Sequence, residues 1–249
     1  MSLVLSSTAR TDRGLVRSNN EDVLYAGQRL LAVADGMGGH VAGEIAATLV
    51  IAALTPLDDN PPPGDLLRAL YVAVQAGNTA IRDSIEEHPK LAGMGTTLTA
   101  MLFAGDRIGV ANIGDSRTYR LRDGVAAPLT HDDSLVQFFI DAGRITPEEA
   151  RNHRQRAVLL RALTGKDEEP TLSLHETRIG DRFLLCSDGL SDVVDDDTIG
   201  ETLRIPHPHA CADQLIKLAL HGGGPDNVTV IVADVEEAKA LADEPALQT

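Results

Sequence analysis

The chain has 249 residues, 43% of them hydrophobic, which is enough to bury a substantial core in one domain. Its 22 basic and 37 acidic residues give a net charge of -15, and with no Trp and 3% aromatic residues it lacks a phosphate-neutralising surface and a base-stacking platform. This composition argues against nucleic acid as a partner. The acidity favours divalent cations or a basic partner, unless it is simply the charge of a soluble surface.

No apolar run approaches the roughly 18 residues of a membrane span, and the first residues lack the apolar core of a signal peptide. The two cysteines, Cys186 and Cys211, fit a reducing compartment, and we expect both to be small core residues. We therefore expect a cytoplasmic monomer, or the cytosolic domain of a longer membrane-anchored protein.

Strands are expected in residues 3–34, interrupted by a polar segment at 17–22. The unbroken apolar run from Leu30 to Ala34 leads through Asp35 into several glycines, which predicts a buried strand that ends in a functional loop. An ordinary hairpin turn at Asp35-Gly36 is the alternative. Helical spacing of apolar residues then predicts helices over 44–54 and 65–87, separated by a break at 61–64.

Residues 97–104 and 107–112 predict a hairpin, which 117–122 would continue as a meander. Asp123-Gly124 predicts a type I′ turn without chemistry. From 130 to 165 we expect a protruding insertion with two short helices, the first starting at a Ser134–Gln137 capping box and the second at Thr146-Pro147. Its basic residues either face a phosphorylated substrate or are solvated surface; they are Arg144, Arg151, His153, Arg154, Arg156 and Arg161.

The last third of the chain predicts strands at 171–174 and 182–186, helices at 196–203 and 208–221, and a final strand at 228–233. Residues after Glu236 have no core pattern. We therefore expect a catalytic domain over 1–236 and an acidic tail or linker over 237–249.

Three carboxylates stand next to strand ends: Asp35 and Asp188 follow apolar strands, and Asp226 precedes one. In an antiparallel sheet these positions share one edge, where the carboxylates would repel one another unless cations lay between them. Oxygen ligands suit Mg²⁺ or Mn²⁺ better than Zn²⁺. Two such ions about 3.5 to 4 Å apart can activate a water for phosphate-ester hydrolysis, with Arg17 as a clamp for the phosphoryl oxygens.

Other phosphate chemistries do not fit the spacing. The chain has no Gly-rich loop followed by Lys and Ser or Thr, and Val41 occupies the last Gly position of a dinucleotide fingerprint. A cysteine nucleophile would need Arg six residues later, where this chain has Asp192 and Lys217. Thiol catalysis is therefore excluded.

Together, these segments resemble the motifs of the metal-dependent type 2C (PPM) Ser/Thr protein phosphatases, particularly the actinobacterial form that opposes transmembrane Ser/Thr kinases. The resemblance covers about residues 5 to 235. In chain order the matching segments are Arg17…Asn20-Glu21-Asp22, Asp35-Gly36-Met37-Gly38-Gly39-His40…Gly43-Glu44, Gly95-Thr96-Thr97, Asn112-Ile113-Gly114-Asp115-Ser116-Arg117, Ser187-Asp188-Gly189-Leu190 and Asp226-Asn227-Val228-Thr229-Val230.

The resemblance implies an α+β fold, a four-layer αββα sandwich of two antiparallel sheets flanked by helices, with a metal centre at one sheet edge. It also implies hydrolysis of phosphoserine and phosphothreonine by a water that bridges two Mn²⁺ or Mg²⁺ ions, a possible third ion, a flap at about 131–165, and kinases and their substrates as partners. The implied ligands are Asp35 as the bridge, the Gly36 carbonyl, Asp188 and Asp226, with Glu21 and Asp22 acting through waters, Asp115 joining Asp188 at the third site, and Arg17 holding phosphate.

Met37 departs from the family pattern, because many eukaryotic members have His at this position. His40 is then the nearest candidate for the general acid, and its alternative role is to orient the loop or the helix that follows. Two competing functions stay open: a same-fold phosphatase of anti-anti-sigma factors, and an inactive regulatory scaffold.

Overall fold

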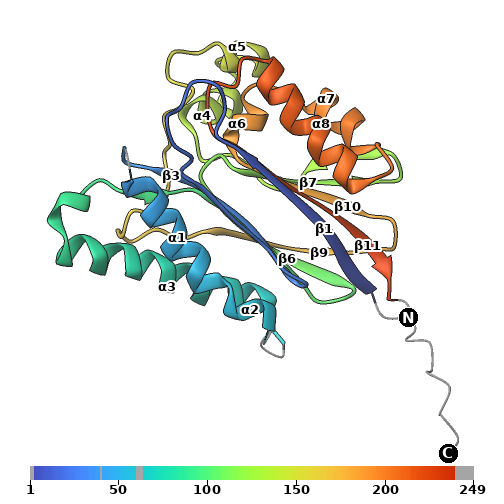
Figure 1. The fold of residues 1–249 in the computed structure, drawn as a ribbon, viewed down its shortest axis with the longest axis horizontal. Coiled ribbons are helices and arrows are strands. Elements are labelled where there is room, and N and C mark those ends of the chain that lie inside the picture. The colour runs from blue at the N-terminus through green and yellow to red at the C-terminus, as the bar shows by residue number, and fades with distance from the viewer. Residues whose placement is uncertain (1–2, 40, 60–63, 239–249) are drawn as a thin grey trace, which may run out of the picture.

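The computed structural model describes residues 3–39, 41–59 and 64–238. Two antiparallel sheets pack face to face and helices cover the outer side of each, which confirms the expected αββα sandwich (Figure 1). The five-stranded sheet has the order β1 (Leu3–Asp12), β11 (Val228–Glu237), β10 (Arg182–Cys186), β7 (Arg117–Arg122) and β8 (Val125–Pro128). The six-stranded sheet has the order β2 (Asp22–Ala26), β3 (Leu30–Met37), β5 (Leu98–Phe103), β6 (Arg107–Ile113) and β9 (Thr171–Glu176), with β4 (Gly95–Thr96) paired to β3.

The helices form two outer layers and a protruding flap. One layer, over the six-stranded sheet, consists of α1 (Ala42–Leu54) and α3 (Leu66–Glu87), followed by α2 (Pro56–Asp59) and a 3₁₀ turn (Pro89–Leu91) beside them. The other, over the five-stranded sheet, consists of α6 (Asp188–Ser191), α7 (Asp196–Leu203) and α8 (Pro208–His221). The flap carries α4 (Leu135–Asp141) and α5 (Pro147–Arg151).

The strand β3 explains how one apolar run serves two cores. Because side chains alternate across a strand, Leu30, Ala32 and Ala34 pack under α1 and α3, whereas Leu31 and Val33 pack between the two sheets. All five are fully buried. The continuous apolar run is therefore a strand covered on both faces, as predicted.

The helix α3 confirms its predicted stripe. Asp65 caps it by accepting hydrogen bonds from the N–H groups of Leu67 and Arg68, each at 3.1 Å. Gly77 allows α1 to approach closely, since a Cβ atom there would lie 2.9 Å from the Cα of Val50. The break expected at 61–64 falls largely outside the described residues, which resume at 64.

The strand β7 corrects the predicted meander. Both edges of β6 are already paired, with β5 and β9, while β7 pairs with β10 and β8 in the opposite sheet. The chain crosses between the sheets at Gly114, whose φ of 97° suits glycine. At the next turn, Asp123 and Gly124 have φ values of 52° and 78°, as the predicted type I′ hairpin requires.

The final strand is longer than predicted, because β11 pairs with β1 along all ten residues, from Val228 opposite Asp12 to Glu237 opposite Leu3. The expected domain end at 236 thus falls within this strand, and residues 239–249 of the expected tail lie outside the described residues. In the described part of the chain, no helix is both long and apolar enough to cross a membrane.

Candidate active site

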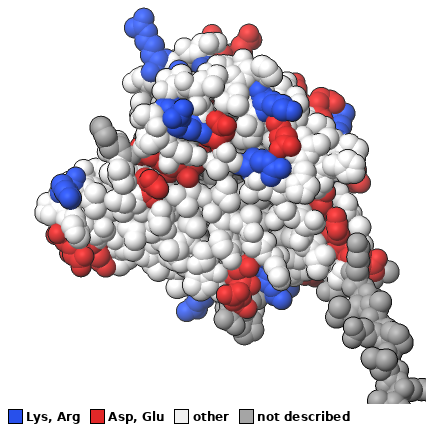
Figure 2. All heavy atoms as spheres, in the orientation of Figure 1, with Lys and Arg blue, Asp and Glu red and all other residues white. Residues whose placement is uncertain are grey.

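The predicted carboxylates meet at one end of the sandwich, but two sheets supply them rather than the single sheet edge that was expected. Asp35 lies on β3 of the six-stranded sheet, whereas Asp188 directly follows β10 and Asp226 directly precedes β11 in the five-stranded sheet. They line a cavity of about 210 Å³ together with Arg17, Asn19, Glu21, Gly36, Met37, Gly38, Gly39, Thr97, Asp115, Ala157, Leu159 and Asn227. On the face seen in Figure 2, acidic side chains gather between the upper and lower halves of the molecule.

The backbone of Asp35 is fixed by its neighbouring strands. Its carbonyl accepts hydrogen bonds from the Thr97 N–H and the Thr96 hydroxyl, each at 2.9 Å, and its N–H donates to the Thr97 hydroxyl at 3.2 Å. On the other side, Asp35 lies opposite Asp22 in the β2–β3 register. Two carboxylates are thus held side by side at the end of a rigid sheet.

Glycines bring the start of α1 close to this strand end. A Cβ atom on Gly36 would lie 2.3 Å from the Gly43 carbonyl, and one on Gly43 would lie 2.0 Å from Oε2 of Glu21. No larger residue fits at either position without moving the backbone. The predicted function of the glycines, close approach of the backbone, is therefore confirmed at Gly36 and Gly43 rather than assigned to a simple turn.

Asn227 ties the loop that carries Arg17 to the start of β11. Its side-chain oxygen accepts the Glu21 N–H at 2.8 Å, and its amide nitrogen donates to the Arg13 carbonyl at 2.9 Å and the Asn19 carbonyl at 2.8 Å. The side chain is buried. These three bonds hold residues 13–21 against the cavity.

Arg17 is exposed and donates from Nη2 to Oδ2 of Asp226 at 2.6 Å. This bond, together with the charges of Asp226, Asp188 and Asp35, raises the pKa of the guanidinium above its ordinary value. The other Asp226 oxygen accepts the Asn227 N–H at 2.8 Å. Arg17 is consequently the cationic side chain at the cavity wall.

Several carboxylate oxygens in the centre lack partners. Oδ2 of Asp22 accepts the Ser187 hydroxyl at 2.8 Å, whereas Oδ1 of Asp22 and Oδ1 of Asp188 are buried without a hydrogen bond. A buried acceptor without a donor is costly. These two oxygens therefore call for a proton or a cation.

The electrostatics of the centre point the same way. Burial, reinforced by neighbouring carboxylates, raises the pKa of Asp35 and of Asp188 well above the ordinary value. Burial also raises the pKa of Asp22 to about 6, and burial with the charges of Asp132 and Asp192 raises that of Asp115 to about 7. The site thus has more negative charge than its own cation can balance, which is the situation that a divalent ion would relieve.

Comparisons with known proteins agree with this geometry. The protein phosphatase 2C family profile matches residues 16–217. The chain belongs to the protein phosphatase 2C family.

Individual relatives support the assignment. The serine/threonine protein phosphatase PstP of Mycobacterium tuberculosis is 61% identical over 247 residues, which are 99% of this chain and 48% of PstP, so the chain spans about half the length of that relative. The serine/threonine phosphatase stp of Listeria monocytogenes is 38% identical, over 90% of this chain and 94% of its own length. A crystal structure of the PstP catalytic domain with two manganese ions superposes with a TM-score of 0.90 and 62% identity, covering 95% of this chain and all of that one.

The donor set of this phosphatase 2C domain fits hard divalent cations, as judged from the orphaned oxygens of Asp22 and Asp188. All candidate donors are carboxylate or carbonyl oxygens, which Mg²⁺ and Mn²⁺ accept. Among the described residues, no three His, Cys, Asp or Glu side chains already stand together as metal ligands. We attribute this to the present pairing of Asp226 with Arg17 and of Asp22 with Ser187.

The predicted site residues are brought together with two exceptions. Asp22 lies behind the cavity, against Ser187, rather than on its wall. His40 falls outside the described residues, so its prediction as the general acid stays untested. The sequence argument gave no role to Asn227, although it quoted this residue in a motif, nor to Ala157 and Leu159 of the flap.

Buried thiols play no part in the site. Cys186 lies on β10 and Cys211 on α8, both buried and unpaired, as predicted. Burial raises the pKa of Cys186 to about 12 and that of Cys211 to about 11, so neither is a nucleophile near neutral pH.

The flap confirms its two helices and corrects one cap. Thr146 and Glu149 form a complete capping box, whereas at Ser134 only half of the box exists, because the Gln137 side chain donates to Asp141 instead. Its basic residues are partly paired within the molecule, as in the Arg161–Asp133 ion pair at 3.1 Å.

Proposed function

We propose that this chain is a metal-dependent protein phosphatase that hydrolyses phosphoserine and phosphothreonine. The observation that carries the proposal is the cavity in which Arg17 stands beside a surplus of buried carboxylates, two of whose oxygens have no donor. Membership of the phosphatase 2C family and a manganese-containing structure of a relative support the same chemistry.

The residue roles follow from position. Asp35, the Gly36 carbonyl, Asp188 and Asp226 would hold two Mn²⁺ or Mg²⁺ ions, with Glu21 and Asp22 acting through waters and Asp115 joining Asp188 at a third site. When bound, the ions supply a water that is acidic enough to act as a nucleophile near neutral pH.

Arg17 binds the phosphoryl group of the substrate. Its guanidinium offers a planar fork of donors that matches phosphate oxygens, and its exposure lets a bulky phosphoprotein reach it. Asp226 orients the guanidinium through the 2.6 Å bond. Met37, Ala157 and Leu159 supply the less polar wall that limits access of bulk water.

The proton for the serine leaving oxygen comes from His40 in this proposal, because Met37 cannot donate one. A serine alkoxide needs protonation far more than a nitrophenolate does. The acid thus matters most for the natural substrate.

The substrates are phosphorylated proteins, with Ser/Thr kinases and their targets as the first candidates and a single catalytic unit, residues 1–236, as the working species. We place this unit in the cytoplasm, whether alone or as part of a longer anchored protein. Two unpaired buried cysteines support a reducing compartment.

The test is phosphate release from a panel of phosphoserine, phosphothreonine and phosphotyrosine peptides with Mn²⁺, with Mg²⁺ and with chelator. We expect release from the first two classes only, and only with metal. An inactive scaffold would release phosphate from none, and release that persists after exhaustive chelation would overturn the metal mechanism. Anti-anti-sigma phosphoproteins belong in the same panel.

A further inference from the structure

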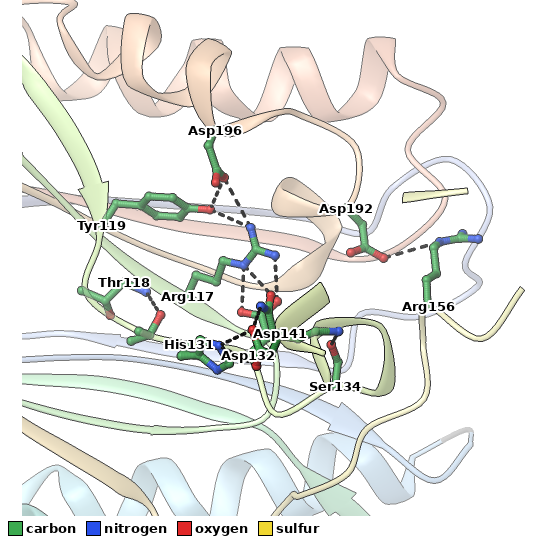
Figure 3. A network of polar contacts seen from close by, with 12 residues as sticks. Arg117, Thr118, Tyr119, His131, Asp132, Ser134, Asp141, Arg156, Asp192 and Asp196 are labelled. Carbon is green, nitrogen blue, oxygen red and sulfur yellow. Dashed lines mark hydrogen bonds and ion pairs between the residues drawn. The ribbon is translucent and has the colours of Figure 1, made fainter. Parts of the chain in front are cut away.

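The flap is pinned to the body at both of its roots. At the first root, Arg117 holds Asp132 through Nε at 2.9 and 3.1 Å and through Nη2 at 2.7 Å, as Figure 3 shows. At the second root, Leu163 and Thr96 exchange backbone hydrogen bonds at 2.9 Å in both directions. The roots therefore stay with the sheets whatever the rest of the flap does.

Between the roots, one segment of the flap reaches the catalytic cavity. Ala157 and Leu159 line that cavity, and Leu159 forms a β-bridge with Ser134 near the first root. The wall that faces an incoming substrate thus depends on where residues 157–159 lie.

One ion pair links this segment to the body. Nε of Arg156, next to Ala157 in the chain, lies 3.5 Å from Oδ2 of Asp192. Figure 3 shows the Arg156 side chain reaching across to Asp192, apart from the Arg117 cluster. Among the described residues 134–160, this is the one ion pair or side-chain hydrogen bond to a residue outside the flap.

The body side of the pair belongs to the catalytic centre's own scaffold. Asp192 directly follows α6, which starts at Asp188, and its N–H donates to the Asp188 carbonyl at 2.8 Å. Arg156 is 47% exposed and Asp192 35% exposed. A pair of that exposure is weak, so it biases the position of the flap rather than fastening it.

We propose that Arg156 and Asp192 are positioning residues that hold Ala157 and Leu159 against the catalytic cavity and thereby favour binding of phosphoproteins. A small aryl phosphate touches too little of the flap to need this wall. A phosphoprotein, which extends beyond the phosphate, does need it. This role in substrate binding rests on the proposed phosphatase function, whereas the position of the flap does not.

The test compares Arg156→Asp, Asp192→Arg and the double exchange, which restores the pair with reversed charges. The matched control is the same set at Arg10 and Asp213, an ion pair at 2.7 Å with 39% and 49% exposure on β1 and α8. The first readout is amide hydrogen exchange of residues 134–160 in the chelated protein, which needs no activity. The second is the KM and kcat for a phosphothreonine protein and for p-nitrophenyl phosphate.

We expect each single variant to exchange faster in the flap and to raise KM for the phosphoprotein about two- to fivefold, the range of a half-exposed pair. The kcat values and the aryl-phosphate kinetics should stay close to wild type, the double exchange should recover both readouts, and the control set should change neither. Unchanged exchange in both singles, or a double variant as impaired as the singles, would overturn the proposal. If exchange responds as expected but no variant or wild type cleaves phosphoproteins, the flap inference holds and the proposed function fails.

Discussion

Nη2 of Arg17 lies 2.6 Å from Oδ2 of Asp226, so the proposed phosphate clamp and a proposed metal ligand are bonded to each other. The two residues come from opposite ends of the chain and meet only because β1 and β11 pair along their whole length. A change at Arg17 therefore reports on both phosphate binding and the metal centre.

Arg17→Lys should keep the charge but lose the two-pronged donor geometry. We expect kcat/KM to fall roughly ten- to a hundredfold, because hydrogen bonds to charged groups contribute about 1.5–3 kcal/mol. Inhibition by inorganic phosphate should weaken in parallel. Arg13→Lys, on the same loop, is the matched control and should change neither; loss of Mn²⁺ binding in calorimetry of Arg17→Lys would instead assign Arg17 a role in building the metal centre.

Removing a metal-binding carboxylate should be far more damaging. Asp35→Ala, Asp188→Ala and Asp226→Ala should each lower turnover roughly a thousandfold or more, several kcal/mol of transition-state stabilisation, because the ions act on both nucleophile and phosphoryl group. Calorimetric titration with Mn²⁺ should show reduced affinity. Variants that bind Mn²⁺ and turn over normally would remove these residues from the site.

Asn227→Ala should loosen the loop that carries Arg17. We expect a loss of about 1–3 kcal/mol in the free energy of unfolding, because buried partners are left unpaired, together with a higher KM for phosphopeptides. Asn78→Ala is the control: Asn78 is equally buried and bonds to Lys166 and Gly165. It should lose comparable stability with an unchanged KM, whereas equal kinetic effects of both variants would reduce Asn227 to a general structural residue.

The metal-free protein should become less stable as pH rises from about 4 to about 7. Unfolded Asp carboxyls titrate near 3.9, whereas Asp22 and Asp115 keep their protons to about 6 and about 7 in the folded protein, so the folded state binds more protons in this window. The melting temperature with chelator should fall across the window, and less so in Asp115→Asn.

The sign of this pH effect has an internal control. Hydrogen bonds from the N–H groups of Leu30, Arg29 and Gln28 lower the pKa of Asp58 despite its partial burial. Asp58→Asn should therefore cost more stability at neutral pH than at acid pH. A melting temperature that rises with pH in the metal-free wild type, and equally in Asp115→Asn, would contradict the assignment at Asp115.

His40→Ala should separate the two substrate classes. If His40 protonates the leaving oxygen, phosphoserine-peptide turnover should fall much more than p-nitrophenyl phosphate turnover, and the peptide pH–rate profile should lose its basic limb. Equal slowing of both substrates with an unchanged profile would leave His40 an orienting role.

The sequence by itself determined the elements and the chemistry of the candidate site. The apolar run before Asp35 could only be a strand covered on both faces, and Asp65 and Thr146 announced helix starts, because periodicity and capping are local properties. The carboxylates beside strand ends were found for the same reason. The half-formed cap at Ser134 marks the limit of such local rules, since Gln137 found a better partner in Asp141.

Only the tertiary structure decided which strands share a sheet and which loops share a cavity. The strand β7 looked like the continuation of a hairpin, yet β9, far along the chain, occupies the edge of β6 that it would have used. The hydrogen bonds of Asn227 to residues 13–21 and the pairing of Arg156 with Asp192 are likewise contacts between distant segments. Such partners are selected by the packing of two sheets against each other, a property of the whole chain that no local pattern contains.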